Sequence, residues 1–104
     1  IHGMAHITGG GLPENLPRCL SPDRSIEMDL NGWQIPPAFQ WLATAGNVAP
    51  VDMFNTFNMG IGYVVIVPAT SVSDSIAFFK SHQIGADPIG VVVPGDRSLI
   101  GMWG

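Results

Sequence analysis

The chain has 104 residues, a length that fits one domain, and we expect residues 1–104 to form a single domain. Hydrophobic residues make up 46%, charged residues make up 12%, and the formal net charge is −4 with four cationic side chains, which argues against a nucleic-acid partner. One cysteine excludes an internal disulfide framework and fits a cytoplasmic protein, and the longest apolar run, residues 61–67, is too short to span a membrane.

The first feature along the chain is a short, largely apolar segment, residues 1–8, that ends in three glycines, Gly9–Gly11. We expect a strand over 1–8 and a helix over 13–20, which Pro17 keeps short or bent. Adjacent glycines are tolerated where the backbone takes positive φ or approaches another group closely. The turn is therefore either a loop whose N–H groups bind an anion at a helix N-terminus, or a tight strand-to-helix turn without a ligand.

The middle of the chain predicts one strand and two helices. Strict polar–apolar alternation over 25–30 predicts a strand with one buried face, and Asn31-Gly32 then turns the chain. A helix begins at Pro36 or Pro37 and ends at Gly46, and a second helix begins at Pro50. We expect three aromatic side chains of this region in the core, namely Trp33, Phe39 and Trp41.

The last third alternates strands and a helix. The β-branched run over 63–67 predicts a central strand buried on both faces. A helix capped by Ser71 or Ser73 and ended by Gly85 follows, and strands over 89–93 and 98–103 complete the chain. Inward-facing positions of the helix are Ile76, Phe79 and Ile84. This order of elements predicts an α+β domain in which helices pack against a mixed β-sheet.

A few side chains are candidates for chemistry. His6 and Thr8 share one face of the predicted strand, and the His6 imidazole is either a proton donor or acceptor or a structural histidine. Asn15 lies where it can face a ligand of the glycine turn, and Asn58 lies in a turn where it bonds a ligand or its own backbone. His2 and His6 are about 13 Å apart along a strand and have no evident third ligand, so no metal site is expected.

Three blocks add up to a specific pattern. They are HGMAHITGGG at 2–11 with ENLPR at 14–18, WQIPPAFQWL at 33–42, and MFNTFNMGIG at 53–62. In this order they closely resemble the AIR synthase (phosphoribosylformylglycinamidine cyclo-ligase) family. The resemblance implies an enzyme of purine biosynthesis that uses ATP and Mg²⁺ to close formylglycinamidine ribonucleotide into aminoimidazole ribonucleotide, with release of ADP and phosphate.

The resemblance also implies a place for this chain within such an enzyme. It corresponds to the latter part of the C-terminal domain, whereas ATP and Mg²⁺ are bound mainly by an N-terminal domain that these residues lack, so we expect the chain alone to be inactive. Family members are homodimers with the active site in a groove between domains. The loop from His6 to Gly11 would line that groove and contact the small ribonucleotide substrate. His6 is the candidate catalytic residue, and the candidate substrate-binding residues are Thr8, Gly9, Gly10, Gly11, Asn15 and Asn58.

Two other interpretations stay open. One is another member of the same ATP-dependent superfamily, such as formylglycinamidine ribonucleotide synthetase or thiamine-monophosphate kinase, which the block at 57–60 disfavours. The other is a non-catalytic module that only binds or dimerises.

Overall fold

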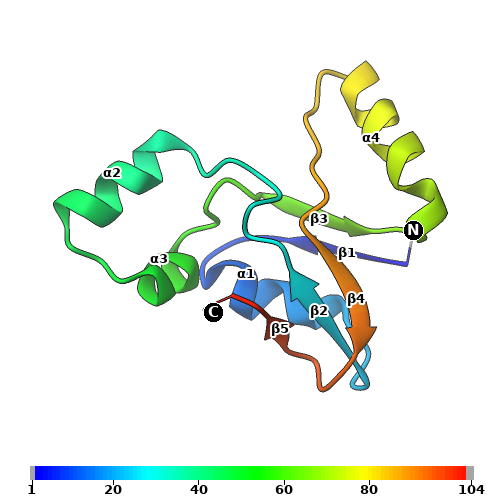
Figure 1. The fold of residues 1–104 in the computed structure, drawn as a ribbon, viewed down its shortest axis with the longest axis horizontal. Coiled ribbons are helices and arrows are strands. Elements are labelled where there is room, and N and C mark those ends of the chain that lie inside the picture. Colours follow the sequence, from blue (N-terminus) through cyan, green and yellow to red (C-terminus); the bar gives the residue numbers. More distant parts are fainter. Residues whose placement is uncertain (1, 103–104) are drawn as a thin grey trace.

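The structure, a computed structural model, describes residues 2–102 (Figure 1). Its elements are β1 Gly3–His6, α1 Gly11–Asn15, the 3₁₀ turn η1 Leu16–Cys19, β2 Arg24–Met28, α2 Pro37–Ala45, α3 Pro50–Thr56, β3 Tyr63–Ile66, the 3₁₀ turn η2 Ala69–Ser71, α4 Val72–Ser81, β4 Gly90–Pro94 and β5 Leu99–Ile100. None of the helices in this range is long and apolar enough to cross a bilayer. The α+β class predicted from the sequence is confirmed.

The strands form two small sheets where a single mixed sheet was expected. β1 pairs with β3 in antiparallel fashion, and β2 lies between an antiparallel β4 and a parallel β5. Only the three-stranded sheet is therefore mixed. Figure 1 shows α2 and α4 on opposite sides of the strands, with the loop from β1 to α1 near the middle of the molecule.

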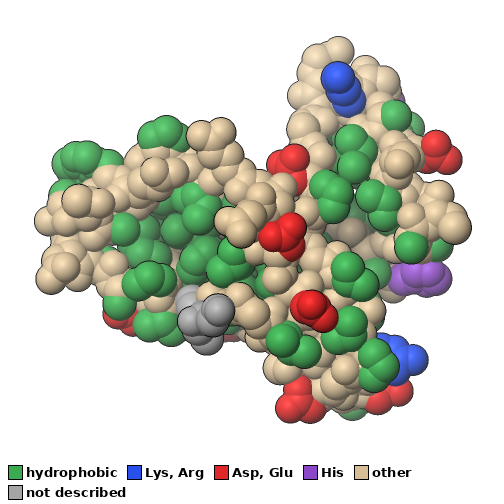
Figure 2. Space-filling view, in the orientation of Figure 1, with side chains coloured by type: hydrophobic (Ala, Val, Ile, Leu, Met, Phe, Trp, Pro, Cys, Tyr) green, Lys and Arg blue, Asp and Glu red, His purple; other side chains and the backbone are tan. Residues whose placement is uncertain are grey.

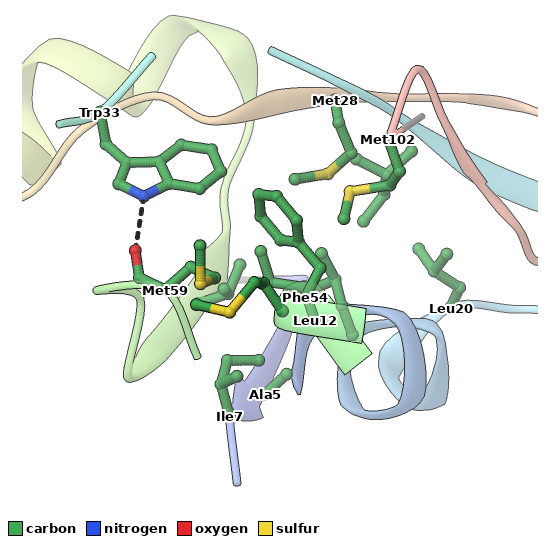
Figure 3. Packing of buried hydrophobic residues seen from close by; sticks show 13 residues of the cluster. Ala5, Ile7, Leu12, Leu20, Met28, Trp33, Phe54, Met59 and Met102 are labelled. Carbon is green, nitrogen blue, oxygen red and sulfur yellow. Dashed lines mark hydrogen bonds between the residues drawn. The ribbon is translucent and has the colours of Figure 1, made fainter. Parts of the chain in front are cut away.

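One hydrophobic cluster joins both sheets to α1 and α3 (Figure 3). The alternation of β1 places Ala5 and Ile7 inside while their neighbours stay exposed. Its buried members are Ala5, Ile7, Leu12, Leu16, Leu20, Ile26, Met28, Trp33, Met53, Phe54, Met59, Val64 and Met102. Residues 12, 16 and 20 recur every four positions, and the α-helix changes to a 3₁₀ turn around Pro17, as its proline predicts.

Several burial predictions are wrong. Tyr63 is 55% exposed, because β3 pairs only with β1 among the described residues and is not a central strand. The side chain of Trp41 is 68% exposed and Ile84 is also exposed, whereas Trp33 is buried as expected.

The ends of α4 also differ from the prediction. Ser71 precedes α4 but makes no side-chain capping bond, and the helix ends at Ser81, before Gly85.

Hydrophobic side chains are open to solvent around α2 and α3 and on α4 (Figure 2). Phe39 is half-buried and packs against the core from one side of α2. No residue of α2 or α4 is fully buried. These two helices therefore have amphipathic sequences whose apolar faces are only partly covered within residues 2–102.

A conservative change at Trp33 tests the join between the segment after β2 and the turn after α3. The Trp33 indole nitrogen donates a 3.0 Å hydrogen bond to the Met59 carbonyl, and the ring is 8% exposed. We expect Trp33→Phe to lower the free energy of unfolding by about 1–3 kcal/mol, because it leaves a buried carbonyl without its donor. Trp41→Phe is the matched control and should change stability by less than about 0.5 kcal/mol. Equal midpoints for both variants in denaturant titrations would contradict the assignment.

Candidate functional site

The glycine turn runs from Thr8 into α1. Gly10 and Gly11 have φ of 93° and 64°, and the Gly11 amide donates a 3.0 Å hydrogen bond back to the Thr8 carbonyl. Positive φ at two adjacent positions reverses the chain between β1 and α1 and is adopted at low cost only by glycine. α1 has five residues, so its dipole is short, and the expected attraction of an anion to a helix N-terminus loses most of its basis here.

The three glycines have different surroundings. A Cβ atom built on Gly9 would meet nothing within 4 Å. One on Gly10 would overlap the flexible Glu14 carboxylate and lie 2.8 Å from the Glu14 Cβ. One on Gly11 would overlap the backbone carbonyl oxygen of Phe54 and lie 2.8 Å from that of Phe57. Gly11 is thus needed for close packing against α3, whereas Gly9 faces open space and leaves the backbone approachable.

The buried side chain of Asn15 forms hydrogen bonds to the same glycine turn. Its side chain is 4% exposed, and Nδ2 donates to the carbonyl of Gly11 at 2.8 Å, of Thr8 at 3.2 Å and of Gly9 at 3.3 Å. The Oδ1 atom accepts from the Thr8 hydroxyl at 3.2 Å. The amide that we expected to face a ligand is therefore engaged with the loop itself.

His6 lies at the edge of a pocket of about 250 Å³ beside this turn. The pocket is lined by Met4, Ala5, His6, Asn15, Arg18 and Cys19. The His6 side chain is exposed, pairs across the sheet with Tyr63 at a ring-centroid distance of 6.0 Å, and touches no carboxylate among residues 2–102. Thr8 is exposed on the same side of the chain, as the strand alternation predicts. The two side chains are thus exposed to a molecule from solvent, although the Thr8 hydroxyl also donates to Asn15.

Two residues of the pocket were missed from the sequence. Arg18 forms an exposed ion pair with Glu14 at 3.1 Å and lies 3.5 Å from the Asn15 Oδ1 atom. The Cys19 thiol donates to the Leu16 carbonyl at 3.1 Å, and burial raises the pKa of this thiol. Cys19 therefore stays protonated near neutral pH and is a poor nucleophile. The spacing of Glu14 and Arg18, four positions apart on one helical turn, is the signal that could have identified the ion pair.

Asn58 lies in the turn between α3 and β3, outside the lining of the pocket. Its Oδ1 atom accepts a 2.9 Å hydrogen bond from the Gly60 amide. Of the two alternatives that the sequence left open, the structure shows the bond to the backbone. The turn still reaches the end of β1, since the Ile7 amide donates to the Gly62 carbonyl at 2.9 Å.

The three sequence blocks meet in space. Gly11 of the first block packs on the Phe54 and Phe57 carbonyls of the third. Trp33 of the second block donates a hydrogen bond to Met59 of the third (Figure 3). The first and third blocks also share the β1–β3 pairing. Residues that are distant in sequence thus form one interlocked unit around the glycine turn.

The donor set for a metal ion is poor. Between residues 2 and 102, the structure contains no group of three or more His, Cys, Asp or Glu side chains placed to hold a metal. The pocket holds one imidazole and one thiol, and its charged group is the Arg18 guanidinium. These residues do not fit a Mg²⁺ ion, which prefers carboxylate and water oxygens, and no Mg²⁺-dependent step is assigned to them.

Comparison with known proteins places this unit in a family. The family model described as "AIR synthase related protein, C-terminal domain" matches residues 1–101. The chain is 58% identical over 102 residues to the phosphoribosylformylglycinamidine cyclo-ligase of Synechococcus elongatus and 57% identical to that of Crocosphaera subtropica, covering 98% of this chain and 30% of each relative. It is 51% identical over 104 residues to the enzyme of the same name from a Cyanothece species, covering 100% of this chain and 28% of that relative. The chain thus spans about a third of the length of these relatives, and it belongs to the AIR synthase related family as a C-terminal domain.

Proposed function

We propose that this chain forms the substrate side of an ATP-dependent cyclo-ligase that converts formylglycinamidine ribonucleotide into aminoimidazole ribonucleotide, ADP and phosphate. The observation that carries the proposal is identity of 51–58% over nearly the whole chain to proteins that bear this enzyme's name. The match covers 98% of the chain and so takes in the glycine turn and the two blocks that pack around it. The chain would be the latter part of the C-terminal domain of such an enzyme.

Within this function, the exposed side of the loop would bind the small ribonucleotide substrate. His6 and Thr8 face solvent beside the pocket, and Gly9 leaves the backbone open to close approach. His6 is the candidate catalytic or anchoring residue. Thr8, Gly9 and Gly10 are candidate substrate contacts. Gly11 would hold the loop against the Phe54 and Phe57 carbonyls, and Asn58 would fix the turn of the third block that bonds to Ile7.

ATP and Mg²⁺ would be bound mainly by parts of the enzyme other than these residues. This assignment is supported by the lack of a fitting cluster of oxygen ligands between residues 2 and 102. We further propose that the full-length enzyme is a cytoplasmic homodimer with the active site in a groove between its domains. Sedimentation of the full-length protein tests the dimer.

A chimera tests the proposed activity. The C-terminal segment of the Synechococcus elongatus relative that corresponds to this chain is replaced by residues 1–104, and the unaltered relative serves as reference. Purified chimera should form aminoimidazole ribonucleotide when formylglycinamidine ribonucleotide and ATP are supplied. A folded chimera that binds ATP but makes no product would instead favour a non-catalytic binding or dimerisation module.

The chain alone should not catalyse the reaction. We expect no aminoimidazole ribonucleotide above background from the 104-residue chain with ATP, Mg²⁺ and substrate, because its described residues offer no site for the nucleotide's metal ion. The chimera run in parallel is the positive control. Turnover by the isolated chain would show that ATP is bound here and would overturn the division of roles.

A further inference from the structure

The Asn15 carboxamide is a buried polar group whose donors and acceptor are both directed at the loop. Its Nδ2 atom has two protons and faces three carbonyl oxygens, of which that of Gly11 is nearest at 2.8 Å. Its Oδ1 atom lies 3.2 Å from the Thr8 hydroxyl and 3.5 Å from the Arg18 guanidinium. Every polar atom of this side chain thus has a partner within the protein.

Asparagine meets this set of partners in a way that close substitutes do not. A carboxylate at position 15 has the same shape but no donor, so the three carbonyl oxygens would face a negative charge. Glutamine is longer by one methylene and would not fit at this buried position against the loop without displacing it. The site therefore selects for the planar amide at this reach.

We infer that Asn15 is a positioning residue, not a substrate contact: it fixes the conformation of residues 8–11 and so presents Thr8 and Gly9 to the substrate. The Gly11 amide, bonded to the Thr8 carbonyl at 3.0 Å, reports on this conformation, because Asn15 donates to the same carbonyl. The expected effect of Asn15 on activity rests on the proposed function. Its expected effect on the conformation of residues 8–11 rests on the geometry alone.

The test is Asn15→Asp in the full-length chimera, with Asn55→Asp as matched control. Asn55 is exposed on α3 and makes no side-chain hydrogen bond among the described residues. In the substrate-free protein, we expect exchange of the Gly11 amide proton to be at least about tenfold faster in Asn15→Asp, the equivalent of one lost hydrogen bond, while amides of β2 and β4 keep their rates. The control should leave all of these rates unchanged.

Activity gives the second measurement. A misplaced loop should lower kcat/KM by about a hundredfold per folded molecule. Unchanged Gly11 exchange together with weakened substrate binding would show that Asn15 contacts the substrate and would overturn the inference. If the parent chimera is inactive, the proposed function fails, yet faster Gly11 exchange in Asn15→Asp would still support the positioning role, and unchanged exchange would refute it.

A milder variant covers the case in which Asn15→Asp does not fold. Thr8→Val removes one donor to the Asn15 Oδ1 atom and keeps the side-chain shape, and Thr44→Val on exposed α2 is its control. We expect Gly11 exchange to rise severalfold in Thr8→Val only. Equal exchange rates in Thr8→Val and wild type would overturn the role of the Asn15 amide.

Discussion

Gly11→Ala is expected to lower the free energy of unfolding of this domain by about 3 kcal/mol or more. Two effects add at this position. The new Cβ would overlap the Phe54 carbonyl oxygen and lie 2.8 Å from that of Phe57, which are backbone atoms that move only if α3 moves. In addition, a non-glycine residue at φ 64° is strained by about 1 kcal/mol.

The neighbouring glycines provide graded controls for this prediction. Gly9→Ala should change stability by less than about 0.5 kcal/mol, because a Cβ there meets nothing within 4 Å. Gly10→Ala should lie between the two, since the Glu14 carboxylate can rotate away but the contact with the Glu14 Cβ at 2.8 Å and the positive φ remain. Urea titrations of the full-length chimera, monitored by proteolysis of this domain, measure the order. Similar midpoints for Gly9→Ala and Gly11→Ala would show that α1 does not pack on α3 as described.

His6→Ala should lower kcat/KM by about 10- to 100-fold with little change in melting temperature. The side chain is exposed, and its one aromatic neighbour is the Tyr63 ring at 6.0 Å, so the fold gains little from it. A hydrogen bond from an imidazole to a charged substrate group contributes about 1.5–3 kcal/mol, which corresponds to this loss. Because no carboxylate orients the ring within residues 2–102, we expect the loss mainly in KM, as an anchoring role predicts.

Steady-state kinetics of the chimera with His2→Ala as control measure this effect. His2 is exposed just before the same strand but lies outside the pocket lining. A fall in kcat above about a hundredfold with KM unchanged would indicate proton transfer instead of anchoring. A lower melting temperature with normal kinetics would make His6 a structural histidine.

Local sequence patterns predicted where helices and strands lie better than they predicted which residues are buried. Alternation over 25–30 identified β2, and Pro17 marked the change from α-helix to 3₁₀ turn, because both depend on neighbours along the chain. The exposure of Trp41 and the edge position of β3 depend on which segments cover them. Residue 103 of the predicted last strand lies outside the described residues, and β5 is observed at 99–100.

In the candidate site, too, features set by the local backbone could be predicted, whereas features set by tertiary contacts could not. The glycine run and the shared face of His6 and Thr8 could be predicted, since they follow from backbone conformation and a period of two. The inward direction of Asn15 could not, because its three carbonyl partners come together only when two successive residues adopt positive φ. The hydrogen bond that Asn58 accepts from the Gly60 amide is one of two alternatives that the sequence leaves open, because it depends on the conformation of the turn.

The strand pairings bear on the order in which this domain folds. β1 pairs with β3 and β2 pairs with β4 and β5, so no two strands adjacent in sequence pair with each other among residues 2–102. The buried Ser25 hydroxyl accepts hydrogen bonds from the amides of Asp96 and Ser98, which lie 71 and 73 residues further along the chain. During synthesis, β2 therefore leaves the ribosome long before its partners exist, with its apolar face unpaired. Such non-local topology predicts slow folding for a domain of this size.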